Sequence, residues 1–125
     1  MKTLLWVLQV LLALAFLAHG VMLLMPPPDI VDQLNASLAR WFQVFLGVAE
    51  VLAAVGLILP GVTRIYPSLV SWSAVGVMIV MISATVYHVV RDEFSSALIT
   101  AALLAIATFI AYARWRILPV PARSR

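Results

Sequence analysis

The sequence predicts an all-α integral membrane protein: a four-helix bundle with up-down-up-down connectivity and both termini in the cytoplasm. Of its 125 residues, 65% are hydrophobic and only 10% are charged, and the mean hydropathy is +1.12. Soluble domains are about 45–50% apolar and about 25% charged. The apolar residues fall into four runs long enough to cross a hydrocarbon core of about 30 Å. We therefore expect one membrane domain over residues 1–125.

The first expected span covers residues 3–25 and ends at the prolines of residues 26–28, which cannot continue a helix. Lys2 followed by an apolar run, with the ALA sequence at residues 13–15, also resembles a cleavable signal peptide. The apolar run continues to Met25, which is longer than a typical signal-peptide core. We therefore expect a retained membrane span.

Prolines or charged residues end the other three expected spans, which cover residues 38–59, 66–90 and 96–118. The second span ends at Pro60, the third at Arg91 and the fourth before Pro119. The connections between them are short, so consecutive helices should be antiparallel neighbours. The longer Pro-rich loop, residues 26–37, is expected to lie over the outer membrane surface as a short amphipathic turn.

The basic residues predict the orientation, because cytoplasmic loops carry an excess of Lys and Arg. Two of the eight, Arg40 and Arg91, fall on one side of the predicted topology. The other six fall on the side of both termini: Lys2, Arg64, Arg114, Arg116, Arg123 and Arg125. This asymmetry predicts cytoplasmic termini.

Composition excludes several classes of site. The chain has no cysteine, so it forms no disulfide, thiolate metal site or cysteine nucleophile. Its net charge is +3 and its isoelectric point about 10.0, but the basic residues are too few and too scattered for a nucleic-acid surface. No nucleophile motif or phosphate loop is present. The chemistry is expected inside the membrane.

Glu50 is a carboxylate in the middle of an apolar span. A charged side chain at the centre of a membrane helix costs about 2.5–3.5 kcal/mol on insertion scales. At about 100° per residue, Glu50 shares a narrow stripe with Gln43, Gly47 and Ala54. Small residues beside polar ones are typical of helix–helix contacts in membranes, so Glu50 should point into the bundle.

Other polar residues on the expected spans suggest a pocket in the outer half of the bundle. Glu50 would form its floor, His19 and Gln43 its wall, and Thr85 and His88 its mouth. We interpret Glu50 as the candidate acid or base, with His19 or His88 as its counterpart. The residues expected to line a hydrophobic ligand are Gln43, Ser73, Met81 and Thr85.

Simpler interpretations stay open for these residues. Glu50 could be a protonated structural residue that donates one interhelical hydrogen bond, and His88 could be a hydrated interfacial residue beside Arg91. A metal site is not expected, because no two ligands share metal-binding spacing on one helix. Small-residue faces, with Ala54 on the second span and Ala101 on the fourth, could also form a homo-oligomer interface.

Three short motifs point to a known family. LAFLAHGVMLL (residues 14–24) lies in the first span, LGVAEVLAAVGLILPGVTR (residues 46–64) in the second, and ATVYHVVRDE (residues 84–93) ends the third. In these motifs the chain resembles the DoxX-like family of small bacterial membrane proteins. The resemblance implies that Glu50 and His88 belong to a family pocket.

The family's first-span pattern has a Phe and a Gly, matched here by Phe16 and Gly20. It often has a Lys three residues after the Gly, where this chain has Leu23. The resemblance implies a multi-pass protein of the bacterial inner membrane. It also implies a link to redox systems, since the family is named for a subunit similar to part of a thiosulfate:quinone oxidoreductase. The broader clan includes proteins that bind sterol-like or isoprenoid lipids.

Three functions follow as hypotheses. The first is an accessory or anchor subunit that presents a quinone-like or lipid-like ligand to a redox partner protein. The second is a small membrane enzyme, an isomerase, cyclase or hydrolase, that uses Glu50 with a histidine on a hydrophobic substrate. The third, a transporter, would need oligomerisation, because four helices are few and no inverted repeat is evident.

Overall fold

A computed structural model describes residues 1–123 of the chain, and Arg125, one of the charges that predict the orientation, lies outside the described residues. The structure is helical, with no strand in the described part. Its elements are α1 (Lys2–Leu24), α2 (Val31–Ser37), α3 (Arg40–Thr63), α4 (Ser68–Val90), α5 (Phe94–Tyr112) and the π-helix η1 (Ala113–Ile117). Residues 1–123 include four helices long and apolar enough to cross a membrane: α1, α3, α4, and α5 continued by η1. The predicted all-α fold with four membrane helices is confirmed.

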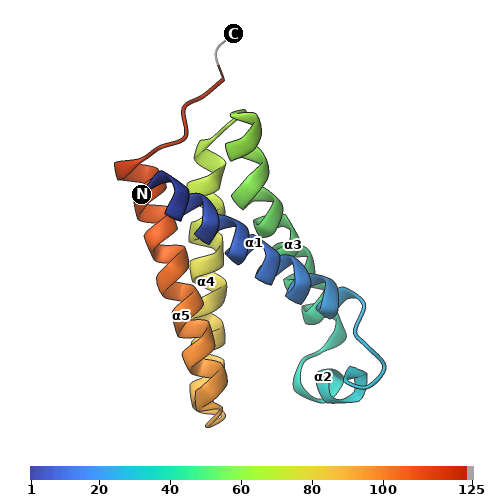
Figure 1. Cartoon of the computed structure of the whole chain (residues 1–125). Helices are drawn as coiled ribbons and strands as arrows, with labels where there is room; N and C mark the ends of the chain where they lie inside the picture. The colour runs from blue at the N-terminus through green and yellow to red at the C-terminus, as the bar shows by residue number, and fades with distance from the viewer. Residues whose placement is uncertain (124–125) are drawn as a thin grey trace.

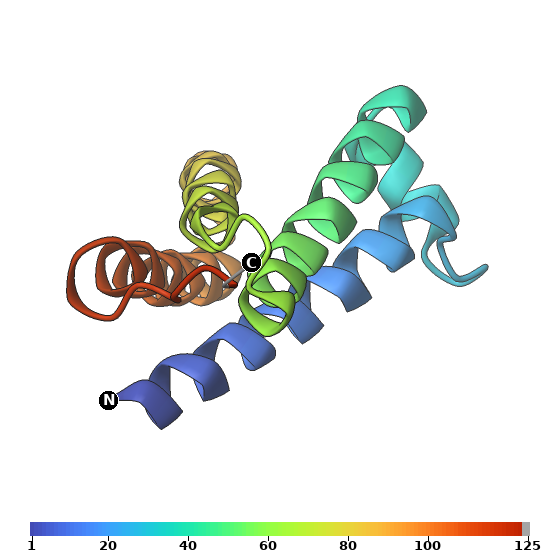
Figure 2. The ribbon, with the colours of Figure 1, turned by 90° about the horizontal axis from the view of Figure 1, so that it is seen from above.

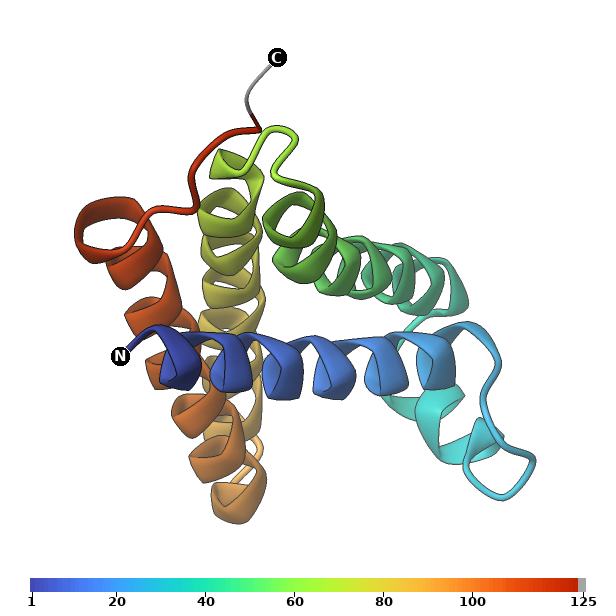
Figure 3. The ribbon, with the colours of Figure 1, turned by 45° about the horizontal axis from the view of Figure 1, so that its top comes forward.

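The four long helices form two antiparallel pairs, α1 with α3 and α4 with α5 (Figures 1 and 2). The pairs meet near the end of the molecule that carries the N-terminus, the α3–α4 connection and η1, which we call the terminal end. Toward the opposite end, which carries α2, the pairs move apart (Figure 1). Figure 3 shows α1 crossing α4 and α5 obliquely before it reaches α2. The bundle is therefore splayed rather than parallel-sided.

The apolar core lies where the two pairs meet. Its largest buried side chains include Leu12 and Phe16 of α1, Leu57 of α3, Val77 of α4 and Ile110 of α5. Many large apolar side chains on the outer surface are exposed instead. Exposed apolar side chains are expected on the outer face of a bundle that contacts lipid. In lipid the backbone polar groups must form their hydrogen bonds within each helix.

Two glycines set the contact between α1 and α3. A Cβ atom added at Gly20 would lie 2.9 Å from the carbonyl oxygen of Gly47, and a Cβ at Gly47 would lie 2.9 Å from that of Gly20. Real Cβ atoms essentially never make so short a contact. The two backbones therefore approach to a distance that only glycine permits at both positions, as in other membrane helix pairs.

Helix α3 continues through Pro60 to Thr63, past the end expected at residue 59. A proline in a helix leaves the carbonyl four residues earlier, here that of Gly56, without its helical partner. Neighbouring groups bond the carbonyls beside it: Gln9 Nε2 donates to Leu57 at 2.8 Å, and Thr63 Oγ1 donates to Leu59 at 2.8 Å. Membrane helices tolerate proline where neighbouring helices and hydroxyl side chains bond to the backbone around it.

The small residues of α5 are distributed over several of its faces, and the use of Ala101 in a homo-oligomer interface stays a prediction. The described structure leaves Ala105 exposed and Ala101 half-buried, whereas Ala107 and Ala111 are buried against the core. Alanines recur throughout this helix, so their spacing alone does not identify the packed face. On α3, by contrast, the predicted stripe is confirmed, since Gln43, Gly47, Glu50 and Ala54 are all buried.

Candidate functional site

His19 and Glu50 form a hydrogen-bonded pair beside the crossing of α1 and α3. The distance between His19 Nδ1 and Glu50 Oε2 is 2.7 Å. The Glu50 side chain is 2% exposed, whereas that of His19 is 51% exposed. The carboxyl group is thus buried between the helices, and the imidazole reaches from it to the outer surface of α1.

The glycine crossing places this pair. A Cβ at Gly20 would lie 3.2 Å from Cβ of Glu50, so the α1 backbone passes directly over the stem of the glutamate. His19 precedes Gly20 and is brought within one hydrogen bond of the carboxyl group. The sequence predicts both residues as site candidates. The close approach of the α1 and α3 backbones accounts for the short distance between His19 Nδ1 and Glu50 Oε2.

The arrangement leaves one polar atom of the pair available. Nδ1 of His19 is engaged with Glu50, and Nε2 makes no hydrogen bond within residues 1–123. A neutral imidazole bonded in this way accepts at Nε2, and an imidazolium donates there. The pair can therefore bind either a hydroxyl or a carbonyl group of a molecule that reaches the surface of α1.

Gln43 lies in a separate polar cluster near α2. Its Nε2 donates to Asn35 Oδ1 at 3.0 Å and to the Leu38 carbonyl at 2.8 Å. Arg40 donates to Gln43 Oε1 at 3.3 Å and to the carbonyls of Leu23 and Leu24 at 2.8 and 2.7 Å. These bonds join the end of α1, the loop and the start of α3. The hydrogen bonds of Gln43 therefore hold this end of the helix pair together.

Ser73 and Met81 of α4 are packing residues. A Cβ at Gly56 would collide with Oγ of Ser73, so the serine fills the space that a side chain at this α3 position would take. Met81 is 5% exposed and belongs to the apolar core. Both fill the space between α4 and its neighbours.

Thr85 and His88 lie farther along α4, where the two helix pairs are apart (Figure 1). Thr85 Oγ1 bonds to the Met81 carbonyl at 2.7 Å and to Thr100 Oγ1 at 2.8 Å. His88 Nδ1 lies 3.4 Å from Glu93 Oε1, which accepts from Arg91 Nε at 2.9 Å. Desolvation opposes ionisation of Glu93, but the bonds from Arg91 and His88 hold its pKa below its usual range. His88 therefore belongs to the α4–α5 connection rather than to the Glu50 pair.

An apolar groove of about 510 Å³ runs along α1 and α3. Its lining residues are Val10, Ala13, Leu14, Leu17, Ala54, Val55, Ile58 and Leu59. At about 100° per residue, His19 is turned about 180° from Val10, so the groove lies on the other flank of α1. Neither member of the His19–Glu50 pair lines it.

A second buried polar cluster was not anticipated from the sequence. Gln9 of α1 is fully buried, and its Oε1 accepts from Nε of Arg114 at 2.6 Å. The sequence signal was present, since Gln9 is an amide in an apolar span and Arg114 falls inside the expected fourth span. An arginine near the end of a membrane span is typical of a topological charge, so the sequence alone does not indicate that Arg114 is buried.

Comparison with known proteins agrees with the motifs. The family model of the DoxX-like family matches residues 7–110, which include both members of the His19–Glu50 pair, the whole of α3 and α4, and most of the first and fourth membrane helices. No curated protein and no solved structure matches in the corresponding searches. Because the matched region covers nearly the whole chain, this multi-pass membrane protein belongs to the DoxX-like family.

Proposed function

We propose that the chain is an accessory membrane subunit that binds a hydrophobic ligand of the quinone or isoprenoid-lipid class at the His19–Glu50 pair. The subunit presents this ligand to a redox partner protein in the bacterial inner membrane. The observation that carries the proposal is the difference in exposure between the two side chains. Glu50 is buried, His19 is half exposed, and His19 Nδ1 lies 2.7 Å from Glu50 Oε2.

The surroundings of His19 favour a ligand that is dissolved in the bilayer. The residue is five positions from the end of α1, which places it about 8 Å inside the helix. The helix is apolar, and on the face of His19 its neighbours one turn away are Ala15, which is exposed, and Met22, which is half-buried. A polar atom on such a surface finds few partners except the oxygen of a hydrophobic molecule, such as a quinone carbonyl or a quinol hydroxyl.

The role of Glu50 in this proposal is to orient the imidazole. A carboxylate that accepts from Nδ1 fixes which ring nitrogen faces outward, and it stabilises the imidazolium when Nε2 is protonated. The ligand's oxygen then meets a donor in one protonation state and an acceptor in the other. This suits a ligand whose oxidised form has carbonyls and whose reduced form has hydroxyls.

The short connections support an accessory role. Residues 64–67 join α3 to α4, and residues 91–93 join α4 to α5. Neither is long enough to form a domain that would bind a redox cofactor outside the membrane. We therefore assign electron transfer to a partner protein and ligand binding to this chain.

An enzyme of the membrane is the second candidate. A base held by a second group at hydrogen-bond distance is also the arrangement used for proton transfer in catalysis. In that case His19 would exchange the proton with the substrate, since Glu50 is buried behind it. The same residues serve both candidates, and turnover of the ligand separates them.

The proposal is tested by the lipids that remain with the purified protein. Wild type and Glu50→Gln are purified in mild detergent, and the extracted small molecules are identified by mass spectrometry. We expect wild type to retain a quinone or isoprenoid at a fixed molar ratio. Glu50→Gln should retain several-fold less, because an amide holds the imidazole less strongly than a carboxylate does.

Ser83→Ala is the matched control, since the Ser83 hydroxyl is exposed and bonds only to the carbonyl of Ile79 in its own helix. It should retain as much ligand as wild type. Equal retention by wild type and Glu50→Gln would rule out the His19–Glu50 pair as the binding site. Conversion of the retained molecule to a product by wild type would favour the enzyme.

A further inference from the structure

The guanidinium of Arg114 is buried at the terminal end of the molecule. The residue is 5% exposed. Its Nε donates to Gln9 Oε1 at 2.6 Å, its Nη1 donates to the Leu118 carbonyl at 3.0 Å, and its Cζ lies 5.1 Å from the centre of the Trp6 ring. Nη2 is buried and has no hydrogen-bond partner in the described part of the chain. One donor of a buried cation is thus unused.

Local structure holds the guanidinium in this place. The π-helix η1 follows α5 directly, and within it Ala113 and Arg114 are buried whereas Arg116 is exposed. Gln9 Nε2 donates to the Leu57 carbonyl, so the orientation of its amide is fixed and Oε1 faces Arg114. Arg114 is therefore bonded to α1 through Gln9, and Gln9 is bonded in turn to α3.

No carboxylate side chain balances this charge. The chain has five acidic residues. Glu50 is paired with His19, and the other four lie in the two connections at the other end of the helices: Asp29, Asp32, Asp92 and Glu93. Among residues 1–123, the hydrogen-bond partners of Arg114 are all neutral. A buried charge without a counterion is costly, so a counter-anion is expected from outside the chain.

A cavity of about 320 Å³ adjoins Arg114. Its lining includes Ser68, Ser71, Trp72 and Trp115. The two serine hydroxyls make no hydrogen bond within the described residues, whereas Thr63, Ser83, Thr85 and Thr108 each donate to the carbonyl four residues earlier. Ser68 begins α4, whose N-terminal turn carries a partial positive charge and favours anions.

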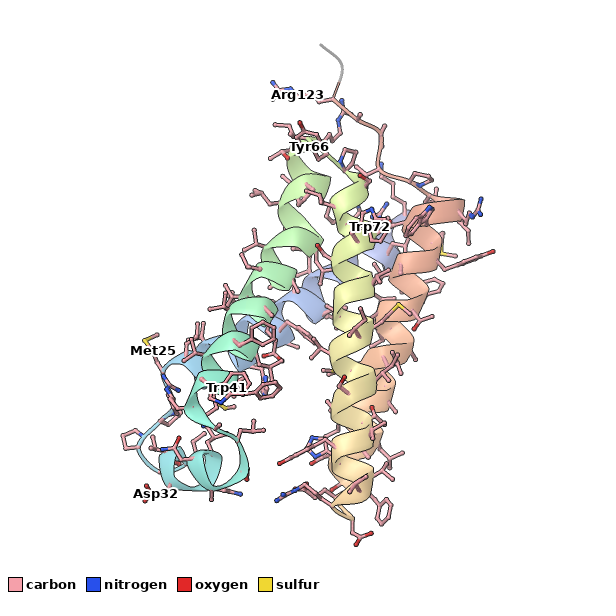
Figure 4. All side chains as sticks on the ribbon, turned by 180° about the vertical axis from the view of Figure 1, so that it is seen from behind. Met25, Asp32, Trp41, Tyr66, Trp72 and Arg123 are labelled. Carbon is pink, nitrogen blue, oxygen red and sulfur yellow. The ribbon has the colours of Figure 1, made fainter. Side chains whose placement is uncertain are left out.

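The segment after η1 forms part of the cavity wall, through Pro119, Val120 and Ala122. The backbone N–H of Arg123 donates to the carbonyl of Arg64 at 2.8 Å, which holds residues 118–123 across the start of α4. Figure 4 shows Arg123 beside Tyr66 at this end, above Trp72. Trp72 and Trp115 stack edge to face with ring centres 5.0 Å apart. Tryptophans are enriched at the membrane–water interface, where lipid phosphates lie.

We propose that this cavity binds a phosphate group, which Arg114 Nη2 and the hydroxyls of Ser68 and Ser71 hold at the N-terminus of α4. Arg114, Ser68 and Ser71 line the same cavity, and donors from three side chains suit a phosphate group, which presents several oxygens. The group could belong to inorganic phosphate or to a phospholipid headgroup, since both present the same oxygens. The proposal is independent of the His19–Glu50 site, which uses other residues of α1 and α3.

The test measures the unfolding temperature of the full chain in neutral, phosphate-free detergent. One arm adds inorganic phosphate, with chloride at equal ionic strength as its reference. The other adds short-chain phosphatidylglycerol, with short-chain diacylglycerol as its reference. A ligand that binds only the folded state raises the unfolding temperature as its concentration rises. We expect such a rise in at least one arm.

The double variant Ser68→Ala/Ser71→Ala is the decisive comparison, because it keeps the buried arginine and should fold. Loss of hydrogen bonds to a charged group is expected to weaken the apparent affinity about tenfold or more. Arg114→Lys should weaken it further, since lysine lacks the guanidinium fork. Ser83→Ala should leave it unchanged.

Each outcome decides the proposal. A rise with inorganic phosphate alone, with phosphatidylglycerol alone or with both supports it and names the source of the phosphate group. No rise in either arm overturns it. An equal rise in wild type and Ser68→Ala/Ser71→Ala also overturns it, because the cavity would then not be where the anion binds.

Discussion

His19→Leu is expected to destabilise the folded protein by about 3–5 kcal/mol, the cost of leaving a buried carboxylate without its partner. The substitution leaves the Glu50 carboxyl group, which is 2% exposed, without its hydrogen-bond partner at 2.7 Å. Glu50→Leu is expected to cost less, about 1–3 kcal/mol, because the half-exposed imidazole that remains is less dependent on its partner. The measurement is the free energy of unfolding in mixed micelles.

The double variant His19→Leu/Glu50→Leu should be more stable than His19→Leu alone. Replacing a buried polar pair with apolar side chains of similar volume is often neutral, because no desolvated group is left unpaired. The double variant would then lose less stability than the sum of the two single variants, which is the result expected for two side chains that interact directly. Additive effects of the two substitutions would show that the two side chains do not interact in the folded protein.

Gly47→Ala is the second change with a large expected effect. The added Cβ would meet the Gly20 carbonyl oxygen at 2.9 Å and Leu24 Cγ at 2.9 Å, so α1 and α3 must move apart. Overpacking of this kind costs about 1–3 kcal/mol. The same movement separates His19 from Glu50, so ligand retention should fall together with the unfolding temperature.

Gly76→Ala is the matched control for this experiment. A Cβ at Gly76 of α4 would meet no atom within 4 Å. Alanine is favoured over glycine in helices by about 1 kcal/mol, so this variant should be as stable as wild type or more stable. If both variants shifted the unfolding temperature in the same direction, the close approach of Gly20 and Gly47 would not limit the packing.

The membrane helices could be predicted from the sequence because hydropathy over about 20 residues is a strong signal. Their ends were harder to predict. Pro60 was expected to end the second span, but a proline can remain in a membrane helix when neighbouring helices pack around it. Such packing involves residues such as Gln9, which are distant in sequence.

The candidate site was predictable only in part. The stripe on α3 predicts that Glu50 faces inward, because helical periodicity places it on the same face as Gly47 and Ala54. The position of His88 depended on the angle between the two helix pairs, which no local pattern encodes. Since the pairs splay apart (Figure 1), His88 lies with Glu93 instead of near Glu50.

The burial of Arg114 could not be predicted from local sequence either. Its charge and its place in the expected fourth span were visible, yet its burial depends on the wider turn of η1 and on Gln9, more than 100 residues away. Contacts of this kind arise from tertiary packing. They decide which of the polar residues in an apolar sequence take part in a site.

The central claim, that His19 presents Nε2 to the oxygen of a hydrophobic ligand, is tested most directly by infrared spectroscopy. A quinone labelled with carbon-13 at one carbonyl is added to lipid nanodiscs that contain wild type or His19→Leu/Glu50→Leu. A hydrogen bond lowers the carbonyl stretching frequency, so wild type should show a second, lower band that the double variant and empty nanodiscs lack. If that band is missing from wild type, or equally strong in the double variant, His19 does not bind the ligand.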